Sequence, residues 1–423
     1  MTGAVPGRVL LVAATTGYQT SAFAEAARRV GCGLSLATDR CHILQDPWGD
    51  QAIPVRFDEP AASAELIAVE GRRRPFLGVI AVGDRPTLLA AVAAERLGIA
   101  HNPPAAVIAC RDKYLARQLY KAAGMLVPWF FRAGIAEDPR QLALATNYPC
   151  VLKPLGLSGS RGVIRANDER EFAAAFERIR AILESTQVRI LKEEQNRYVQ
   201  VEGFIPGQEF AVEGIMTGGD LCVTALFDKP DPLDGPHFEE TIYVTPSRAP
   251  ATVQGEIIAT TARAVRALGL TRGPIHAELR WNRDGAWILE VAARPIGGLC
   301  ARILRFGAGM PYEEVILRHA VGEEMPGLTP ERPAAGAMMI PIPAGGVYEG
   351  VDGEDRSARV PGIDEVSITA KVGQIMIPLP EGSSYLGFLF ASGADPVAVE
   401  RSLRRANAEL RFRIAASLPV LGA

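Results

Sequence analysis

The strongest local constraint in the chain is a glycine-rich loop between two short apolar runs, at residues 151–163, which read VLKPLGLSGSRGV. Its three glycines let the backbone approach a ligand closely. Serine hydroxyls, Lys153 and Arg161 add hydrogen-bond donors, and such a loop suits an anion with many oxygens, above all a triphosphate. The loop lacks the Gly-Lys-Ser/Thr of a P-loop and the G-x-G-x-x-G of a dinucleotide site. An ordinary hairpin between two strands explains this stretch equally well.

Length and composition are those of an ordinary globular protein. The chain has 423 residues, and a prior of ~150 residues per domain suggests about three domains. Hydrophobic residues make up 48% and charged residues 22%, as in proteins with a large core. The net charge of -3 provides no basic footprint for nucleic acid.

Three features of the sequence indicate the cytoplasm. The six cysteines show neither a CxxC pair nor a zinc spacing, so we expect small buried thiols in a reducing compartment. The amino-terminal VLLVAA predicts a strand rather than a signal peptide. No apolar run approaches the ~20 residues of a membrane span, and we therefore expect a soluble cytoplasmic protein.

The first hundred residues alternate between strand and helix patterns. Strands are expected at Arg8–Ala14, Leu34–Thr38 and Phe76–Val82, and a helix at Pro86–Leu97. This alternation predicts a parallel sheet covered on both faces, whose ligands would gather at the carboxyl ends of the strands. Those ends are Thr15–Tyr18, Asp39–Arg40 and Gly83–Asp84. Either they form one wall of a substrate site, or the sheet is a purely structural layer.

A boundary marked by two prolines precedes the glycine-rich loop, and a linker between two strands follows it. After the prolines at 103 and 104 we expect one helix over Ala105–Ala123, with Lys113 in its middle; a solvated helix face is the default interpretation of its charges. In VQVEGFIPGQEF a strand becomes a short linker and then a second strand. Backbone groups of such a linker can pair with an adenine edge, and Glu209 could bind a ribose diol. A plain strand–turn–strand with an exposed glutamate is the simpler alternative.

A hairpin further along places two glutamates opposite each other. Its strands are expected at Ile275–Trp281 and Ala286–Ala292. Leu279, Trp281, Trp287 and Leu289 form the apolar set on one face. Matching Leu279 with Leu289 places Glu278 opposite Glu290, and this register requires the three-residue loop Arg283–Gly285.

The facing glutamates predict a metal site. Like charges directly opposite each other on a sheet are unfavourable, and a divalent cation removes the repulsion. Few oxygen ligands, completed by phosphates, suit Mg²⁺. Arg294 lies four residues after Glu290 and is expected on the same face of the strand. Its guanidinium could therefore hold a transferring phosphoryl group or a carboxylate. Gly297 and Gly298 follow it closely in the sequence. Two solvated glutamates, neutralised by neighbouring arginines, are the alternative.

The order of these motifs resembles the ATP-grasp superfamily. Lys113, Lys153 with its Gly/Ser loop, EGFIPGQE, IHAEL and LEVAARPIGG follow one another between residues 103 and 298. Within the superfamily the chain is most similar to carboxylate–amine ligases of the L-amino-acid ligase type. The resemblance implies that two lobes clamp ATP and phosphorylate a carboxylate to an acyl phosphate. An amine then attacks it, and the products are an amide, ADP and phosphate.

The resemblance also implies a fold and a division of the chain. We expect α/β and α+β structure: a parallel-sheet domain, a two-lobed ATP-grasp core and a β-rich carboxyl-terminal lobe. The expected segments are 1–103 for the amino-terminal sheet domain, 104–200 for the small lobe with the Gly-rich loop, 201–330 for the large lobe with the metal site, and 331–423 for the carboxyl-terminal lobe.

Roles follow for individual residues by resemblance. Lys113 and Lys153 would bind ATP phosphates, and the loop residues Ser158, Gly159, Ser160, Arg161 and Gly162 would close over them. Glu202, Phe204 and Ile205 would hold the adenine edge, and Glu209 the ribose. Glu278 and Glu290 would carry Mg²⁺, and Arg294 would stabilise the transferring phosphoryl group.

Two departures from the family pattern stand out. Ala292 occupies the position where the family usually has Asn, so a second Mg²⁺ would lose one expected ligand. Gly203 replaces a common acidic residue, with little effect expected because backbone makes the adenine contacts.

The acceptor end of the site is less defined. His237, Glu239, Glu240, His276, Gly297 and Gly298 are candidates for substrate contacts, although a lone histidine is more often structural. The expected partners are small-molecule carboxylates and amines, with amino acids favoured, and neither nucleic acid nor membrane; a homodimer is left open.

Two other classes of function stay open from the sequence. One is an ATP-grasp enzyme that activates a small acid such as formate, or only transfers the phosphoryl group. The other is a non-catalytic nucleotide-binding module, which Ala292 leaves open. The set Lys113, Lys153, Glu278, Glu290 and Arg294 argues against the second.

Overall fold

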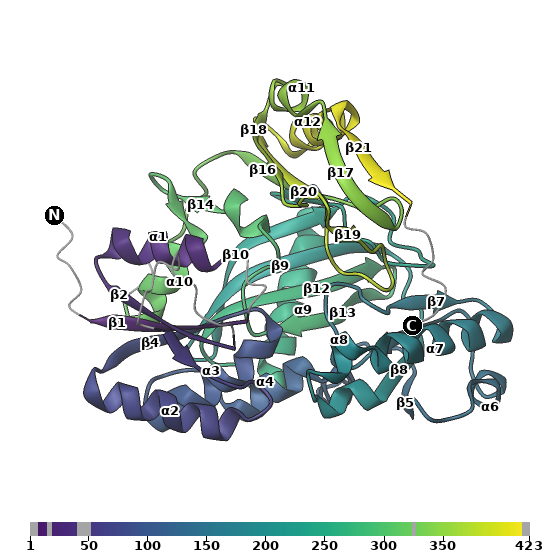
Figure 1. Ribbon diagram of the computed structural model, residues 1–423, viewed down its shortest axis with the longest axis horizontal. Coiled ribbons are helices and arrows are strands. Elements are labelled where there is room, and N and C mark those ends of the chain that lie inside the picture. Colours follow the sequence, from purple (N-terminus) through teal and green to yellow (C-terminus); the bar gives the residue numbers. More distant parts are fainter. Residues whose placement is uncertain (1–6, 15–18, 40–51, 324–326, 417–423) are drawn as a thin grey trace.

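The computed structural model describes residues 7–14, 19–39, 52–323 and 327–416. In Figure 1 the amino-terminal sheet and the small lobe lie side by side at the bottom, and a long twisted sheet rises behind them toward the carboxyl-terminal strands at the top. None of the helices in these ranges is long and apolar enough to cross a bilayer.

The amino-terminal sheet is parallel, as predicted. Its strands lie in the order β3 (Ala52–Pro54), β2 (Gly33–Thr38), β1 (Arg8–Ala13) and β4 (Phe76–Val82). The connecting helices are α1 (Thr20–Val30), α2 (Pro60–Arg73) and α3 (Asp84–Leu97). Alternate residues of β1 enter two different cores, Val9 and Leu11 in one and Leu10 and Val12 in the other, so both faces are covered. Of the strand ends considered above, 15–18 and 40 lie outside the described residues.

The predicted helix over residues 105–123 is two helices. They are α4 (Pro104–Arg111) and α5 (Lys113–Ala122). Asp112 between them is extended, and its side chain accepts hydrogen bonds from the backbone N–H groups of Tyr114 and Leu115, as a helix N-cap does. Lys113 therefore lies at the start of a helix and not in the middle of one.

The small lobe is a four-stranded antiparallel sheet. The strand order is β5 (Phe130–Gly134), β8 (Tyr198–Gly203), β6 (Cys150–Pro154) and β7 (Ile164–Ala166). Its helices are α6 (Pro139–Leu144), α7 (Glu169–Glu184), α8 (Thr186–Arg189) and the short 3-10 turn η2 (Glu194–Arg197). The Gly-rich loop connects β6 to β7, and the apolar stripe of α7 packs under it with Phe172, Phe176 and Ile179.

One antiparallel sheet of eight strands extends through the rest of the molecule. Its order is β13 (Gly285–Ala292), β12 (Gly273–Asn282), β9 (Gln208–Thr217), β10 (Asp220–Lys229), β11 (Ile242–Thr245), β16 (Ala334–Ile340), β20 (Gly387–Gly393) and β18 (Ile363–Ile368). Phe210 and Val212 of β9 face a core with α9 (Ala251–Leu268), and Ala211 and Ile215 face the opposite one. The sheet therefore has helices or the amino-terminal domain on each face.

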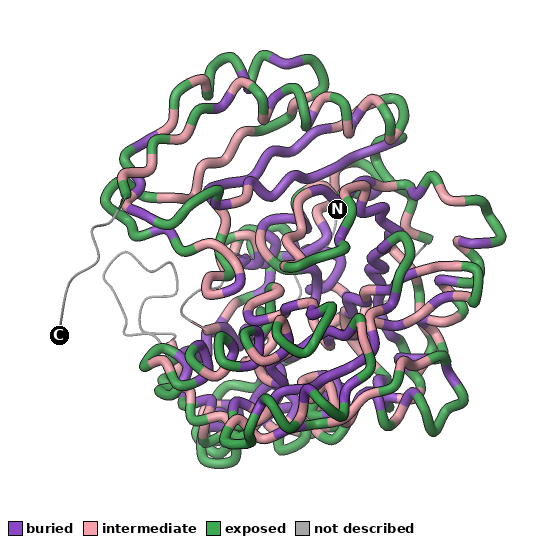
Figure 2. Tube along the Cα trace, turned by 90° about the vertical axis from the view of Figure 1, so that its right-hand side faces the viewer, coloured by how far each residue is buried: buried purple, intermediate pink, exposed green. Residues whose placement is uncertain are grey.

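The remaining elements cover the ends of this sheet. They are η3 (Cys300–Ile303), β14 (Arg305–Phe306), β15 (Met310–Pro311), α10 (Tyr312–Ala320), β17 (Gly346–Asp352), α11 (Glu354–Ala358), β19 (Ile375–Met376), α12 (Pro396–Glu409) and β21 (Arg411–Ala415). Asp395 caps α12 by accepting from the N–H of Ala398. Figure 2 shows buried residues concentrated along the strands and exposed residues on the outer helices and loops. The predicted segment boundaries stay predictions. Strands β11 and β16, which lie on either side of the predicted boundary at residue 330, pair in the same sheet.

The turn of the β12–β13 hairpin is shorter than predicted. Asn282 pairs with Gly285, so the loop has two residues, Arg283 and Asp284, where the sequence predicts three. Gly285 has a φ of 122°, which glycine tolerates at little cost.

A bulge in the same hairpin corrects the predicted register. Glu278 pairs with Glu290, as predicted, but Leu279 pairs with Ile288, because the register shifts between Glu278 and Leu279. The extra residue inserted by a bulge changes which side chains share a face. Ile288 is therefore the core residue, and Leu289, expected in the apolar set, lines a cavity.

The predicted buried thiols are confirmed with one exception. Cys32, Cys110, Cys150 and Cys300 are buried and unpaired, whereas Cys222 is exposed; Cys41 lies outside the described residues. The expectation is wrong for Cys222 because its side chain lies on the open side of β10, in a strand segment where alternate residues are exposed.

The small-lobe core gives a stability prediction. Phe176 is fully buried, so Phe176→Ala should lower the free energy of unfolding by about 3–5 kcal/mol, measured by urea denaturation. Val397→Ala, at a position that is 56% exposed, should change it by about 0.5 kcal/mol or less. Equal effects of the two substitutions would contradict the assignment of this core.

Candidate active site

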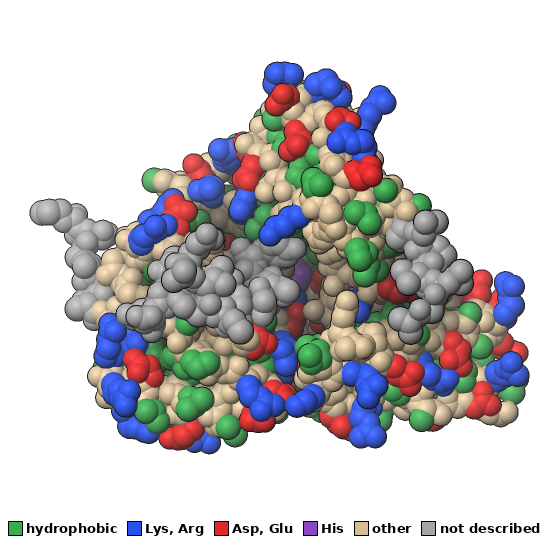
Figure 3. All heavy atoms as spheres, viewed as in Figure 1, with side chains coloured by type: hydrophobic (Ala, Val, Ile, Leu, Met, Phe, Trp, Pro, Cys, Tyr) green, Lys and Arg blue, Asp and Glu red, His purple; other side chains and the backbone are tan. Residues whose placement is uncertain are grey.

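A cavity of about 320 Å³ lies where the amino-terminal sheet, the small lobe, the long sheet and the carboxyl-terminal strands meet. Figure 3 shows a hollow in the middle of this face, in which acidic side chains and a histidine are visible. The predicted site residues that line the cavity are Lys113, Lys153, Ser158, Gly159, Ser160, Glu202, Phe204, Ile205, Glu209, Glu240, His276, Glu278, Glu290, Arg294, Gly297 and Gly298. Residues from distant parts of the sequence, from Lys113 to Gly298, thus share one space. The structure does not bring Arg161, Gly162 or His237 into the lining.

Glu202 lies at the small-lobe end of the cavity in a buried ion-pair network. Its carboxylate accepts from Arg117 at 2.8 and 3.2 Å and pairs with Lys153 at 2.5 Å. Burial alone would raise the pKa of Glu202, but the charges of Arg117 and Lys153 outweigh it and lower the pKa to about 2. Arg117 also donates to the carbonyl of Ile288 at 2.7 Å. The sequence analysis assigns no role to Arg117.

The linker after Glu202 leaves few free groups for a ligand edge. The Phe204 N–H donates to the carbonyl of Pro149 at 3.1 Å, and the Ile205 carbonyl accepts from Arg280 at 2.7 Å. Glu209 accepts from Lys229 at 2.8 Å and from Arg280 at 2.9 Å. The predicted adenine and ribose contacts would therefore compete with interactions inside the protein.

The Gly-rich loop divides its residues between the cavity and the carboxyl-terminal lobe. Ser158, Gly159 and Ser160 line the cavity. Arg161 Nε donates to the carbonyl of Glu381 at 2.7 Å, and the Gly162 N–H donates to the carbonyl of Pro380 at 2.9 Å. The guanidinium of Arg161, predicted as a phosphate ligand, therefore holds the loop against the carboxyl-terminal lobe.

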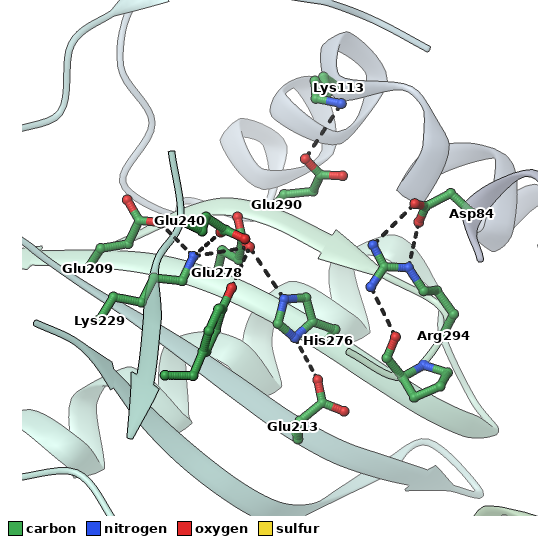
Figure 4. Close-up of polar contacts among 12 residues, drawn as sticks. Asp84, Lys113, Glu209, Glu213, Lys229, Glu240, His276, Glu278, Glu290 and Arg294 are labelled. Carbon is green, nitrogen blue, oxygen red and sulfur yellow. Dashed lines mark hydrogen bonds and ion pairs between the residues drawn. The ribbon is translucent and has the colours of Figure 1, made fainter. Parts of the chain in front are cut away.

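The facing glutamates have different partners. Glu290 lies 3.5 Å from Lys113 Nζ, which also donates to the carbonyl of Leu157 at 2.9 Å. Glu278 accepts from Lys229 at 3.1 Å. Figure 4 shows Glu290 and Glu278 on the same side of their hairpin, with Lys113 above the first and Lys229 beside the second.

Lys229, at the end of β10, is the site residue that sequence reasoning missed. It is 4% exposed, and its ammonium contacts the carboxylates of Glu209, Glu240 and Glu278. Burial alone would lower the pKa of Lys229, but the three carboxylates raise it well above its usual value. The pKa of Glu240 is raised, mainly because the carboxyl group is buried and secondly because the charge of Glu278 lies close to it.

A bulge explains why Lys229 was missed. Counted outward from the Gly218-Gly219 turn, Lys229 would lie opposite Gln208. The register of β9 and β10 shifts between Val223 and Ala225, and Lys229 pairs instead with Glu209. A strand-end lysine beside a predicted site was the one available signal.

His276 lies beside Glu278, one of the two predicted metal ligands. Its Nδ1 is 2.5 Å from Glu213 and its Nε2 is 3.3 Å from Glu278. Burial alone would lower the pKa of His276, but the hydrogen bonds to both carboxylates raise it to about 9. Glu213 is fully buried. The imidazole therefore contacts two carboxylates that flank it and orients Glu278.

Arg294 joins the long sheet to the amino-terminal domain. Its guanidinium donates to both oxygens of Asp84, at 2.8 and 3.1 Å. Burial would raise the pKa of Asp84, but Arg294 lowers it. Val82, Gly83 and Asp84 line the cavity, so the end of β4 forms part of its wall; the substrate role expected for these strand ends stays a prediction.

The donor set fits a hard divalent cation. Glu278 and Glu290 face each other across the hairpin, and Ala292 offers no ligand. Ligand oxygens of Glu209, Glu240 and Glu278 lie within 4.8 Å of one another. The Lys229 ammonium among them shows that this end of the cavity stabilises positive charge, and oxygen-only donors suit Mg²⁺.

Comparison with known proteins agrees with the motif order. Residues 146–303 match the family model described as ATP-grasp domain. Over these residues the chain is similar to the ATP-grasp family, and the predicted fold class is confirmed. Residues 338–415 match the family model described as L-amino acid ligase C-terminal domain 2, so this part of the chain is similar to the carboxyl-terminal domain of the L-amino acid ligases, as the resemblance predicts.

Two of the curated relatives are similar to this chain over part of their length. The uncharacterized protein y4rH of Sinorhizobium fredii is 25% identical over 311 residues, which cover 74% of this chain and 63% of that protein. Dapdiamide A synthase of Enterobacter agglomerans is 30% identical over 190 residues, or 44% of this chain and 43% of that protein. The chain thus spans less than two thirds of the length of these relatives.

Solved structures share the whole fold. An L-amino acid ligase from Bacillus licheniformis superposes with a TM-score of 0.81 at 24% identity, covering 97% of this chain and 99% of that one. A carboxyaminoimidazole ribonucleotide synthase from Aspergillus clavatus, complexed with ATP, has a TM-score of 0.71 at 16% identity and covers 96% and 99%. At these identities the likeness establishes the fold.

The Glu202 network gives a pH prediction. The folded-state pKa is lowered to about 2 from 4.5, so the stabilisation is complete above about pH 4.5 and is lost as the pH falls toward 2; its size is on the order of 3 kcal/mol. Glu202→Gln should flatten the fall in melting temperature between pH 5 and pH 3. The control Glu184→Gln, at an exposed position, should keep the wild-type slope. A wild-type slope in Glu202→Gln would show that this carboxylate does not control acid stability.

The contact between the Gly-rich loop and the carboxyl-terminal lobe gives a second prediction. Arg178 on α7 donates to both oxygens of Glu381, at 2.5 and 2.9 Å, outside the cavity lining. Both side chains are more than a third exposed, so the pair contributes about 1 kcal/mol or less. Arg178→Ala should speed amide hydrogen exchange at residues 156–163 by about fivefold or less, relative to the control Arg170→Ala on the same helix. Equal amide exchange in both variants would show that the Arg178–Glu381 pair does not help to hold the Gly-rich loop against the carboxyl-terminal lobe.

Proposed function

We propose that the protein is an ATP-dependent ligase that phosphorylates a carboxylate and joins it to an amine, with release of ADP and phosphate. The observation that carries the proposal is the facing pair Glu278 and Glu290, set in one cavity with Lys113 and Arg294. The buried ammonium of Lys229 contacts Glu278 from behind the cavity lining. The family matches, and the names of the dapdiamide synthase and the L-amino acid ligase, support this class of reaction.

The nucleotide would lie between the small lobe and the long sheet. Lys113 and Lys153 bind its phosphates, and the backbone of the loop at 158–160 covers them. The linker at 202–205 holds the adenine edge. Glu209 reaches the ribose if Lys229 releases one of its oxygens. Arg161 and Gly162 keep the loop closed through the carboxyl-terminal lobe.

Glu278 and Glu290 would hold Mg²⁺, which when bound neutralises phosphate charge and draws the terminal phosphate toward the acid. His276 fixes the orientation of Glu278, with Glu213 behind it. Glu240 is a further carboxylate of the cavity lining and lies close to Glu278 and Glu209. With a metal among these carboxylates, the ammonium of Lys229 is available to a phosphate oxygen.

Arg294 would act at the reacting centre. Its guanidinium is held by both oxygens of Asp84 and by the carbonyl of Pro295, to which Nη1 donates at 3.0 Å, and it lines the cavity in this fixed orientation. A preorganised guanidinium stabilises charge that develops on a transferring phosphoryl group and on the acyl phosphate. The substrates are small-molecule acids and amines, with amino acids favoured by the names of the relatives. The cytoplasmic location and the homodimer stay predictions from the sequence.

A screen of acid–amine pairs tests the proposal. Phosphate release from ATP with Mg²⁺ should require both an acid and an amine, and an amide should form in equal amount. Glu278→Ala should lower the rate by about 100-fold or more, because charge stabilisation at the phosphates is lost. Glu349→Ala, at an exposed position of β17, is the matched control.

The outcomes separate the candidate classes. A stable phosphorylated product from one acid and ATP would assign phosphoryl transfer instead of ligation. Phosphate release that is unchanged in Glu278→Ala, or absent for every pair although ATP binds, would overturn the ligase proposal.

A further inference from the structure

We propose that the carboxylate substrate has an uncharged, apolar side chain, which lies against Met339 and Phe388 at the carboxyl-terminal end of the cavity. This inference rests on the proposed ligase function and concerns which acids the site accepts. The supporting observations are one face of the long sheet, the glycines Gly297 and Gly298, and the pairing of the nearby charged groups.

The floor of this subsite is one face of the long sheet. Met339 of β16 and Phe388 of β20 are directly paired across their strands, and Tyr243 lies on the neighbouring strand β11. All three line the cavity and are at most 4% exposed. They belong to the core cluster that includes Ile296 and Cys300, whereas Leu157 at the nucleotide end belongs to the small-lobe core. The cavity therefore has an apolar end that is separate from the nucleotide end.

Two glycines connect Arg294 to this apolar floor. A Cβ on Gly297 would meet only Arg294 Nη1, at 4.0 Å, so this position leaves open space beside the guanidinium. Gly298 has a φ of 60°, and a Cβ there would lie 3.0 Å from the Phe388 ring. A carboxylate next to Arg294 would therefore have its substituent beside Gly297 and over Phe388.

The charged groups around this end are already paired. Asp84 holds Arg294, and Glu240 holds Lys229. Glu278 and His276 contact Tyr243 at the edge of this floor, and they too are paired, Glu278 with Lys229 and His276 with Glu213. A charged substituent would be buried without a partner, which is unfavourable, whereas an apolar one gains from contact with Met339 and Phe388.

The chemistry can be followed on the acid alone. A carboxylate oxygen attacks the terminal phosphorus of ATP; the new O–P bond forms as the bond to the ADP oxygen breaks. Hydroxylamine then replaces the amine: its nitrogen attacks the acyl carbon, phosphate leaves with the C–O bond pair, and the nitrogen loses a proton to water. The product is a hydroxamate, which forms a coloured iron complex.

The first experiment compares acids of similar length in this assay. With wild-type protein, ATP, Mg²⁺ and hydroxylamine, norleucine and methionine should give a kcat/KM at least tenfold above that of glutamate and of lysine. Equal or faster reaction of glutamate or lysine overturns the inference and leaves the ligase function standing. Absence of hydroxamate and of phosphate release with every acid, and with every acid–amine pair, overturns the proposed function itself.

The second experiment changes the size of the subsite. Gly297→Leu should lower the ratio of kcat/KM for phenylalanine to that for alanine at least fivefold, and Met339→Ala should raise it. Gly255→Leu on the exposed side of α9, where a Cβ meets nothing within 4 Å, is the control and should keep the ratio. If neither site variant moves the ratio, the side chain does not lie here. Because Gly297 has no positive φ, its substitution strains no backbone, and Met339→Ala tests the inference independently.

Discussion

The buried ammonium of Lys229 is the interaction on which the arrangement of this site depends. Three carboxylates converge on it from β9, β12 and the polar loop before β11. In the low dielectric of a protein interior, these carboxylates could not stay charged together without a cation between them. Lys229 provides that cation before any ligand enters, and it keeps Glu278 oriented toward the cavity. The site is therefore built around positive charge, whether from the protein or from a bound metal.

The same principle of paired charge connects the lobes. Asp84 holds Arg294 across the contact between the first sheet and the long sheet, and Arg117 holds Glu202 between α5 and β8. The Arg117–Glu202 pair is buried and the Arg294–Asp84 pair is half-buried. Both are hydrogen-bonded at more than one atom, which is the condition under which buried ion pairs persist. The guanidinium forks fix orientation as well as charge. Arg294 and Glu202 are thus positioned by partners from other parts of the chain.

The sequence predicts the elements well and the non-local contacts poorly. Strand–helix alternation gave the first sheet, and the opposition of Glu278 and Glu290 followed from apolar matching. The bulge after Glu278, the bulge that moves Lys229 to face Glu209, and the break at Asp112 were missed, because a one-residue shift leaves no trace in periodicity. The partners of Arg117, Arg161 and Arg294 are 85 to 220 residues away, and single-sequence patterns contain no such distances.

One segment of the carboxyl-terminal lobe has contacts on two sides. Pro380 and Glu381 hold the Gly-rich loop, and Ser383, Ser384 and Tyr385 line the cavity a few residues later. A substitution selected for a new acid would therefore also disturb the closing of the loop over the nucleotide. Evolutionary drift in specificity should be easier on β16 and β20, whose side chains can be exchanged without touching that loop, and diversification within such proteins should concentrate there.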